Sequence, residues 1–187
     1  MKQVLSFLLF GVWLACFGGC RTAEPIADVI VEGNGRFPAS LAGMWTANKG
    51  NWQFVFEPDG DISAAVINEG LIKVEAPTKE YRISLQDFGS GVYELGRWTV
   101  QYWPQNRELT VEVVVAHFHL DMPEYVIEGR SRDVFVGPVS EDGRTWRAEW
   151  FMFPQITVLN PDPRELRFDP NSNPRGMLTF TKQEAAG

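Results

Sequence analysis

Apolar and polar residues alternate along much of this chain, and the alternation is clearest over residues 92–121. Residues 98–102 are apolar at even positions, and residues 109–115 are apolar at odd positions. A period of two is typical of a strand that buries one face. Pro104 and Asn106 interrupt it, and both residue types favour a tight reversal. The segment therefore predicts a long β-hairpin, to which the rest of the chain adds shorter strands.

The alternation changes phase near Ala116. After this residue the odd positions are His117, His119 and Asp121, and the apolar residues fall on even positions. A regular strand cannot keep one face dry through such a change. Either a β-bulge near Ala116 exchanges the two faces, and the histidines then face solvent, or the strand stays regular and they lie at one end of the core. The pattern leaves both interpretations open.

The other alternating segments are short and are separated by Gly, Pro, Asn and Asp. They are residues 51–57, 62–67, 71–74, 81–85, 125–136, 145–153, 157–159, 165–168 and 176–182, with an edge strand expected at 26–31. No segment after residue 20 has the period of an amphipathic helix. About nine or ten strands with such turns predict an all-β fold, a single antiparallel barrel or barrel-like sandwich built mostly as an up-and-down meander.

Residues 1–19 have the pattern of an export signal. Lys2 precedes an apolar run over residues 4–17 that is too short to span a bilayer. The run ends in Phe-Gly-Gly-Cys, which resembles the lipobox of bacterial lipoproteins, although Phe17 stands where that family usually has an aliphatic residue. The resemblance implies cleavage before Cys20 and acylation of that cysteine, including by palmitate. Cys16 is a second candidate in a poorer context, and an ordinary cleaved signal is the alternative.

The lipobox resemblance implies a membrane anchor made of lipid. Arg21 follows the cysteine where an aspartate would imply retention at the inner membrane, so the similarity to Gram-negative lipoproteins implies the inner leaflet of the outer membrane, facing the periplasm. The expected organisation is a signal peptide at 1–19, a lipidated N-terminus and flexible tether at 20–40, an all-β domain at 41–182 and a polar tail at 183–187. Both cysteines precede the domain, which therefore has no disulfide.

Charge narrows the range of partners. The chain has a net charge of −7, and removal of residues 1–19 makes it −8 because Lys2 is lost. An acidic surface repels phosphate backbones, so a nucleic acid is not an expected partner. The length suits one domain with a core that needs no metal or disulfide.

A three-residue motif opens the expected domain. Gly43, Met44 and Trp45 resemble the Gly-x-Trp signature of the first strand of lipocalins and related calycin barrels. In that family the tryptophan closes one end of the barrel and packs against an arginine from a late strand. The resemblance implies that Arg175 supplies this arginine and that the fold is a lipocalin-like barrel.

His117, His119 and Asp121 form the sharpest candidate site. Positions i, i+2 and i+4 of a strand share a face, and two histidines and an acid can hold zinc, copper or iron. A further ligand would have to come from elsewhere, and Glu124 and Glu149 are candidates. The competing interpretation is a solvated histidine pair without metal. Apart from this metal ion no cofactor is expected, because the sequence has no phosphate loop or dinucleotide motif.

Two further features, a group of charged residues and a high tryptophan content, are weaker indications of a functional site. Arg130, Arg132 and Asp133 are close in sequence and are interpreted as a charged rim or an ordinary polar face. Six tryptophans outside the signal either fill the core or line a pocket; they are Trp45, Trp52, Trp98, Trp103, Trp146 and Trp150.

These features favour a non-enzymatic role. The expected protein is a lipid-anchored module that binds a small apolar ligand or an envelope protein. A structural envelope lipoprotein without a ligand is the alternative, and a metal-binding protein is a further one.

Overall fold

The computed structural model describes residues 25–67, 70–76, 78–84, 89–167 and 175–184. The elements in this part of the chain are β1 (Ala27–Val31), η1 (Glu32–Asn34), η2 (Ala39–Leu41), β2 (Gly43–Ala47), β3 (Gln53–Phe56), β4 (Ile62–Ile67), β5 (Ile72–Glu75), β6 (Glu80–Ser84), β7 (Ser90–Leu95), β8 (Trp98–Trp103), β9 (Glu108–Asp121), β10 (Val126–Pro138), β11 (Thr145–Asn160), β12 (Arg164–Leu166) and β13 (Arg175–Lys182). The fold is all-β, as the alternation predicts. No helix in the described ranges is long and apolar enough to cross a membrane.

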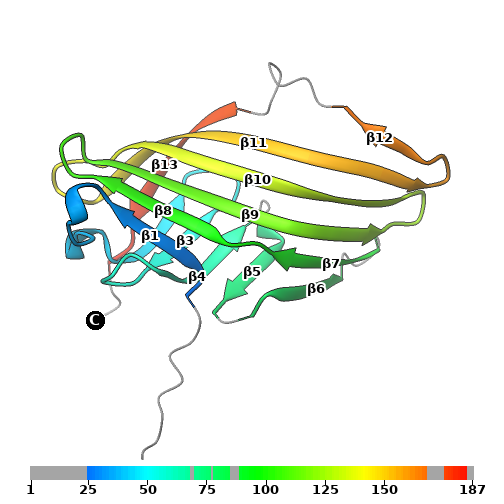
Figure 1. Cartoon of the computed structure of the whole chain (residues 1–187), viewed down its shortest axis with the longest axis horizontal. Helices are drawn as coiled ribbons and strands as arrows, with labels where there is room; N and C mark the ends of the chain where they lie inside the picture. The colour runs from blue at the N-terminus through cyan, green and yellow to red at the C-terminus, as the bar shows by residue number, and fades with distance from the viewer. Residues whose placement is uncertain (1–24, 68–69, 77, 85–88, 168–174, 185–187) are drawn as a thin grey trace, which may run out of the picture.

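The strands form one mixed sheet that curls into a half-barrel (Figure 1). Its main path has the order β1-β8-β9-β10-β11-β13-β2-β3-β4-β5, with β6, β7 and β12 added at the sides. Most pairs are antiparallel, but β1 lies parallel to β8. The expected up-and-down order holds for β8 to β11 and for β2 to β5, but the sheet is not a pure meander, because β1 pairs with β8 and β13 pairs with β2.

Three long strands, β9, β10 and β11, run the whole length of the molecule (Figure 1). The predicted hairpin is present as β8 and β9, and its turn has Arg107 rather than Asn106 in a left-handed conformation. Both β7 and β8 pair with β9, end to end, so the first strand of the predicted segment is two strands. Gly96 lies at the break, where a Cβ atom would approach Val114 to 2.6 Å.

The strand β11 is also longer than the sequence predicts. Pro154 separates two expected strands, yet β11 continues through it in regular register with β10. On its other side β11 pairs with β13 as far as Phe151 and with β12 only from Ile156. Pro154 thus lies where one side of the strand has no described partner, and a missing backbone N–H is tolerated at such an edge.

The phase change in β9 is a β-bulge. Val115 pairs with Ser131 and Phe118 pairs with Gly129, so two residues of β9 stand opposite one residue of β10. The bulge exchanges the faces of the strand, and both Val115 and Phe118 are buried. Gly129 fits this site because a Cβ atom there would lie 2.1 Å from the carbonyl oxygen of Gln155. The structure therefore selects the interpretation in which the histidines face outward.

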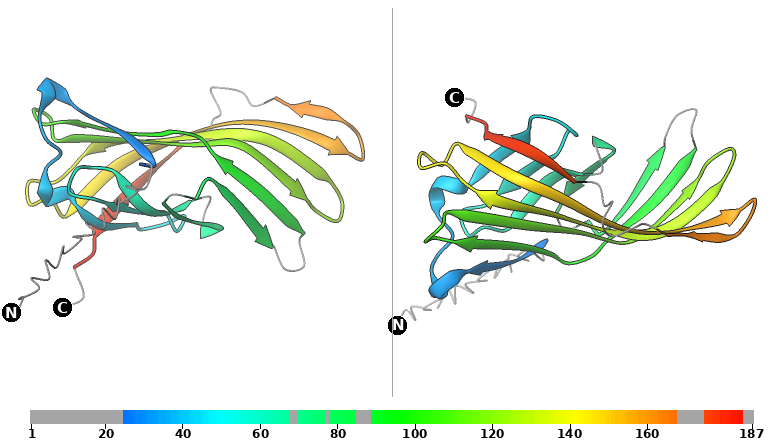
Figure 2. Two further views of the ribbon diagram at one scale, coloured as in Figure 1. Left: turned by 60° about the horizontal axis from the view of Figure 1, so that its bottom comes forward. Right: turned by 90° about the horizontal axis from the view of Figure 1, so that it is seen from above.

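The core fills the curled end of the sheet, where the short strands fold back under the long ones (Figure 2). Trp146 stacks on Phe180 at 4.6 Å between ring centroids, and Phe54 and Phe135 pack edge to face at 5.5 Å. Such aromatic pairs add to the stabilisation from burial. Most of the tryptophans fill the core; Trp45, Trp52, Trp98 and Trp146 are buried, and Trp103 and Trp150 are half-buried.

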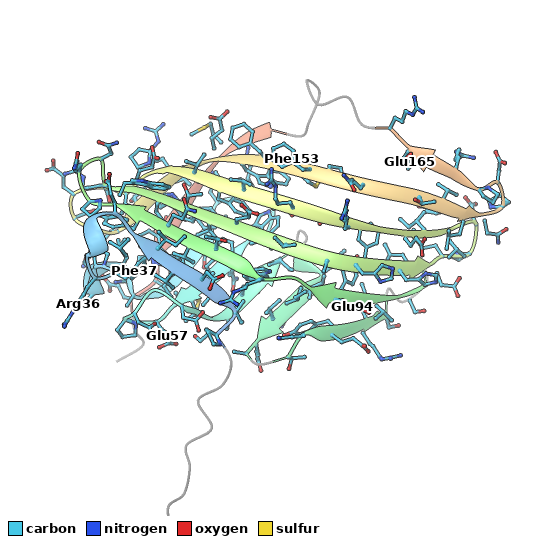
Figure 3. All side chains as sticks on the ribbon, viewed as in Figure 1. Arg36, Phe37, Glu57, Glu94, Phe153 and Glu165 are labelled. Atoms are coloured by element: carbon cyan, nitrogen blue, oxygen red, sulfur yellow. The ribbon has the colours of Figure 1, made fainter. Side chains whose placement is uncertain are left out.

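The folded sheet begins before residue 41. The backbone N–H of Ala27 in β1 donates a 3.0 Å hydrogen bond to Asp61 in the β3–β4 turn. Phe37 is only 6% exposed and packs against Phe56 and Tyr102 (Figure 3). The edge strand expected at 26–31 is present as β1, and Phe37 packs against aromatic residues of β3 and β8. The expected signal peptide and Cys20 lie outside the described residues.

Candidate functional site

A pocket of about 230 Å³ lies on the inner face of the sheet, where the long strands leave the curled end. Its wall consists of side chains from β4, β7, β9, β10 and β11 together with Trp52. The lining residues are Trp52, Ile67, Tyr93, Val115, Phe118, Leu120, Ile127, Ser131, Asp133, Met152, Pro154 and Ile156. An apolar hollow with a small number of polar groups is the usual form of a small-molecule site.

Strand alternation positions the floor of this pocket. On β10 the inward side chains include Ser131, Asp133 and Phe135, and on β11 they include Met152 and Pro154. Asp133 pairs with Met152 across the two strands. The bulge in β9 supplies the adjoining wall, because it turns Phe118 inward after Val115. Local alternation thus brings one acid into an otherwise apolar surface.

Asp133 is the buried acid, with 6% of its surface exposed. Its Oδ1 atom accepts a 2.9 Å hydrogen bond from Nε1 of Trp150. No ion pair of Asp133 occurs among the described side chains. Burial raises the pKa of Asp133 to about 6, although the hydrogen bond from Trp150 lowers it. The carboxylate is thus charged at neutral pH in a place that disfavours the charge.

Trp52 forms the side of the pocket next to the core. Its ring packs against Phe135 at 4.8 Å and against Trp150 at 5.9 Å between centroids. Its Nε1 atom is buried and has no hydrogen-bond acceptor in the described part of the chain. An unsatisfied buried donor costs stability, so the wall of the pocket holds a polar group that has no hydrogen-bond partner among the described residues.

Asp133 was interpreted with Arg130 and Arg132 as part of a charged rim or of an ordinary polar face, and the structure corrects both interpretations for Asp133, which is buried. Successive residues of a strand point to opposite faces, so both arginines lie on the outer face. Arg130 donates a 2.7 Å hydrogen bond from Nε to Gln155, and Arg132 lies 4.7 Å from the centre of the Phe153 ring. Phe135 is the signal that could have found this acid, because an inward phenylalanine two residues later places Asp133 inward as well.

The predicted metal ligands lie on the outer face. His117 is half exposed, and its Nε2 atom is 3.9 Å from Oε2 of Glu128, a neighbour that sequence reasoning did not identify. No group of three side chains able to hold a metal ion occurs within the residues that the structure describes. Glu124 is exposed beyond β9, and Glu149 pairs with Val136 at the other half of β11. Neither joins the histidines.

The residues that carry the lipocalin resemblance do not come together, because Trp45 on β2 and Arg175 lie at opposite ends of β13. Trp45 is fully buried, and its Nε1 donates a 2.8 Å hydrogen bond to the carbonyl of Leu41. Lys182 is its partner on β13, whereas Arg175 pairs with Phe151 at the other end of that strand. The Arg175 side chain is outside the described part. Gly43 has a φ of 118°, which favours glycine.

Three other hollows lined by described residues have no buried polar side chain in their lining. One of them, about 740 Å³, lies between β2 and the turn after Ser140. Its charged side chains already have partners: Lys182 donates to the carbonyl of Ser40 at 2.7 Å, and Arg144 pairs with Glu184 at 3.3 Å. The inner pocket is therefore the better candidate site.

Comparisons of the chain with protein-family models, with curated proteins and with solved structures find no match. The site is therefore interpreted from its own geometry.

Proposed function

We propose that this protein is a non-enzymatic binding module that holds a small apolar ligand in the pocket around Asp133. The observation that carries the proposal is the apolar inner surface between Trp52 and Met152, hollowed to about 230 Å³ beside a filled core. Cavities of about 150 Å³ accept benzene, so this pocket has room for a ligand larger than benzene. In the proposal the half-barrel acts as lipocalin barrels do, which hold one small ligand within a sheet.

The proposal includes the subcellular location that the N-terminal sequence predicts. An acylated Cys20 would tether the module to the inner leaflet of the outer membrane, with the domain facing the periplasm. Several acyl chains give stable attachment where a single chain is marginal. The acidic surface supports a partner other than nucleic acid.

The test is a calorimetric titration of the full chain with 2-phenylethanol, a neutral apolar probe of suitable size. We expect saturable binding to the wild type and a loss of at least tenfold in affinity in Met152→Trp, which fills the pocket. Phe153→Trp is the matched control, since it changes the next residue of β11 on the outer face and should bind as the wild type does. Failure of the wild type to bind any apolar probe would contradict the proposal.

A second candidate is binding of an envelope protein on the outer face. Phe153 is 38% exposed there (Figure 3), and Met177 is 54% exposed. Exposed apolar side chains can mark an interaction site. Photo-crosslinking in the host from position 153 tests it, with position 147 on the same strand as the control. A specific product from position 153 alone supports this candidate, and equal patterns from both positions contradict it.

A further inference from the structure

Asp133 lacks a cation of its own. A buried carboxylate is costly unless it is paired and hydrogen-bonded. The neighbouring arginines on β10 cannot serve, because Arg130 is bonded to Gln155 and Arg132 lies over Phe153, both on the opposite face of the sheet. Trp150 supplies one neutral hydrogen bond and no charge. The acid therefore faces the pocket with its negative charge unbalanced by the described residues.

The rest of the pocket suits a cation with an apolar body. Trp52, Tyr93 and Phe118 present aromatic rings in the lining, and aromatic faces attract ammonium groups. Ser131, two residues before Asp133 on the same face of β10, adds a hydroxyl to the lining. Val115, Leu120 and the other aliphatic residues leave little that could bind a second charged group.

We propose that the pocket takes a small hydrophobic amine, with its ammonium group against Asp133 and its apolar body against Trp52 and Phe118. This inference rests on the proposed function and names the class of its ligand. A cavity of about 230 Å³ has space for an aromatic ring with a short aminoalkyl chain, since about 150 Å³ suffices for benzene. A carboxylate of the same shape would be repelled by Asp133, and an alcohol would lose the charge-assisted hydrogen bond.

The test compares three probes that share a phenyl ring and differ in charge. They are 2-phenylethylamine, 2-phenylethanol and 3-phenylpropanoate, titrated by calorimetry into the full chain at pH 7.5. We expect the amine to bind at least tenfold more tightly than the alcohol, and the carboxylate to bind least, because a hydrogen bond between charged partners is stronger than a neutral one.

Asp133→Asn removes the charge and retains an oxygen that can accept the hydrogen bond from Trp150. In this variant we expect the amine to lose its advantage while the alcohol binds as before. Glu112→Gln is the matched control, because it removes one negative charge from the outer face of the neighbouring strand β9. It should leave the preference for the amine unchanged.

The wild type provides a second test should Asp133→Asn fail to fold. At pH 5 the amine stays protonated while Asp133 is largely neutral, so the preference should fall at least fivefold relative to pH 7.5. Tyr93 on β7 is the only other titratable side chain among the described residues that line the pocket, and β9, β11 and Trp52 contribute none.

The possible outcomes separate the two proposals. Equal binding of amine and alcohol, both blocked by Met152→Trp, overturns the amine and retains the apolar pocket. A preference for the amine that persists in Asp133→Asn, or that is as large at pH 5 as at pH 7.5, overturns recognition by Asp133. Binding of none of the probes to the wild type overturns the proposed function together with this inference.

Discussion

The indole N–H of Trp150 donates a 2.9 Å hydrogen bond to the carboxylate of Asp133, from the neighbouring strand β11 to β10. Trp150 pairs directly with Phe135, so the bond runs diagonally across the two strands. It links the aromatic core to the floor of the pocket. It also stabilises the charged form of an acid whose burial favours the neutral form.

The pH dependence of stability should change when Asp133 is replaced by asparagine. The pKa of Asp133 is about 6 in the folded protein against an ordinary 3.8, so the folded state binds the proton more tightly and the wild type loses stability as pH rises from about 4 to 6. We expect Asp133→Asn to be more stable than the wild type at pH 7.5 by up to about 3 kcal/mol. Urea unfolding at pH 7.5 and pH 4 measures this, and the gap should close at pH 4. A variant less stable than the wild type at pH 7.5 would argue against a costly buried charge.

Loss of the indole donor should raise the pKa of Asp133 further. Trp150→Phe keeps an aromatic ring and removes the N–H, so the hydrogen bond that lowers this pKa disappears. Carboxyl carbon shifts followed by NMR against pH report the change. We also expect a loss of about 1–2 kcal/mol in the free energy of unfolding at pH 7.5. An unchanged pKa would show that the bond does not form in solution.

The bulge in β9 should depend on Gly129. A Cβ atom there would lie 2.1 Å from the backbone oxygen of Gln155, so Gly129→Ala requires the strands to separate. We expect a loss of about 3 kcal/mol in stability, measured by urea unfolding. Gly176→Ala is the control, because its nearest contact would be an ordinary 3.7 Å. Equal stability of the two variants would mean that the sheet relaxes at the bulge at little cost.

Zinc should not bind tightly at the outer histidines. His117 is half exposed, and no group of three side chains able to hold a metal ion occurs among the described residues, whereas a closed zinc site needs four ligands. We expect native mass spectrometry of the full chain with one equivalent of zinc to show no stable adduct. If the wild type retains one zinc ion and the double variant His117→Ala, His119→Ala does not, the histidines form a metal site and this prediction is wrong.

Membrane attachment should depend on Cys20. In a Gram-negative host grown with labelled palmitate, we expect Cys20→Ser to lose the label and to leave the membrane fraction. Cys16→Ser is the matched control and should keep both, since only Cys20 follows the two small residues of the motif. If Cys20→Ser retains the label and Cys16→Ser loses it, the acylated residue is Cys16 and this prediction is wrong.

Alternation predicted which strands exist better than it predicted their partners. The pattern of residues 98–115 indicates half-buried strands, and β8 and β9 follow it. The sequence pattern did not predict which strands pair. For example, β1 lies parallel to β8, with Ala27 opposite Trp98. Contacts across such a sequence separation depend on how the whole sheet curls, because several edges offer equivalent backbone hydrogen bonds.

The candidate site shows the same division. Asp133 was visible in the sequence two residues before an inward phenylalanine, but its neighbours in the pocket come from five strands and a turn. Trp52 and Tyr93 reach it only because the half-barrel folds the β2–β3 turn and β7 toward β10. A sequence pattern records whether a side chain is buried, and it does not record which distant surface buries it.

By itself the sequence determined an all-β chain with one long hairpin and a change of phase at Ala116, because strand periodicity and turn chemistry are local. Only the tertiary structure decided that the phase change is a bulge, that His117 faces outward and that Asp133 lies in an apolar pocket. The physical reason is that each of these depends on close packing between strands, and the space available beside Gly129 or Trp52 is set by residues far away in the chain.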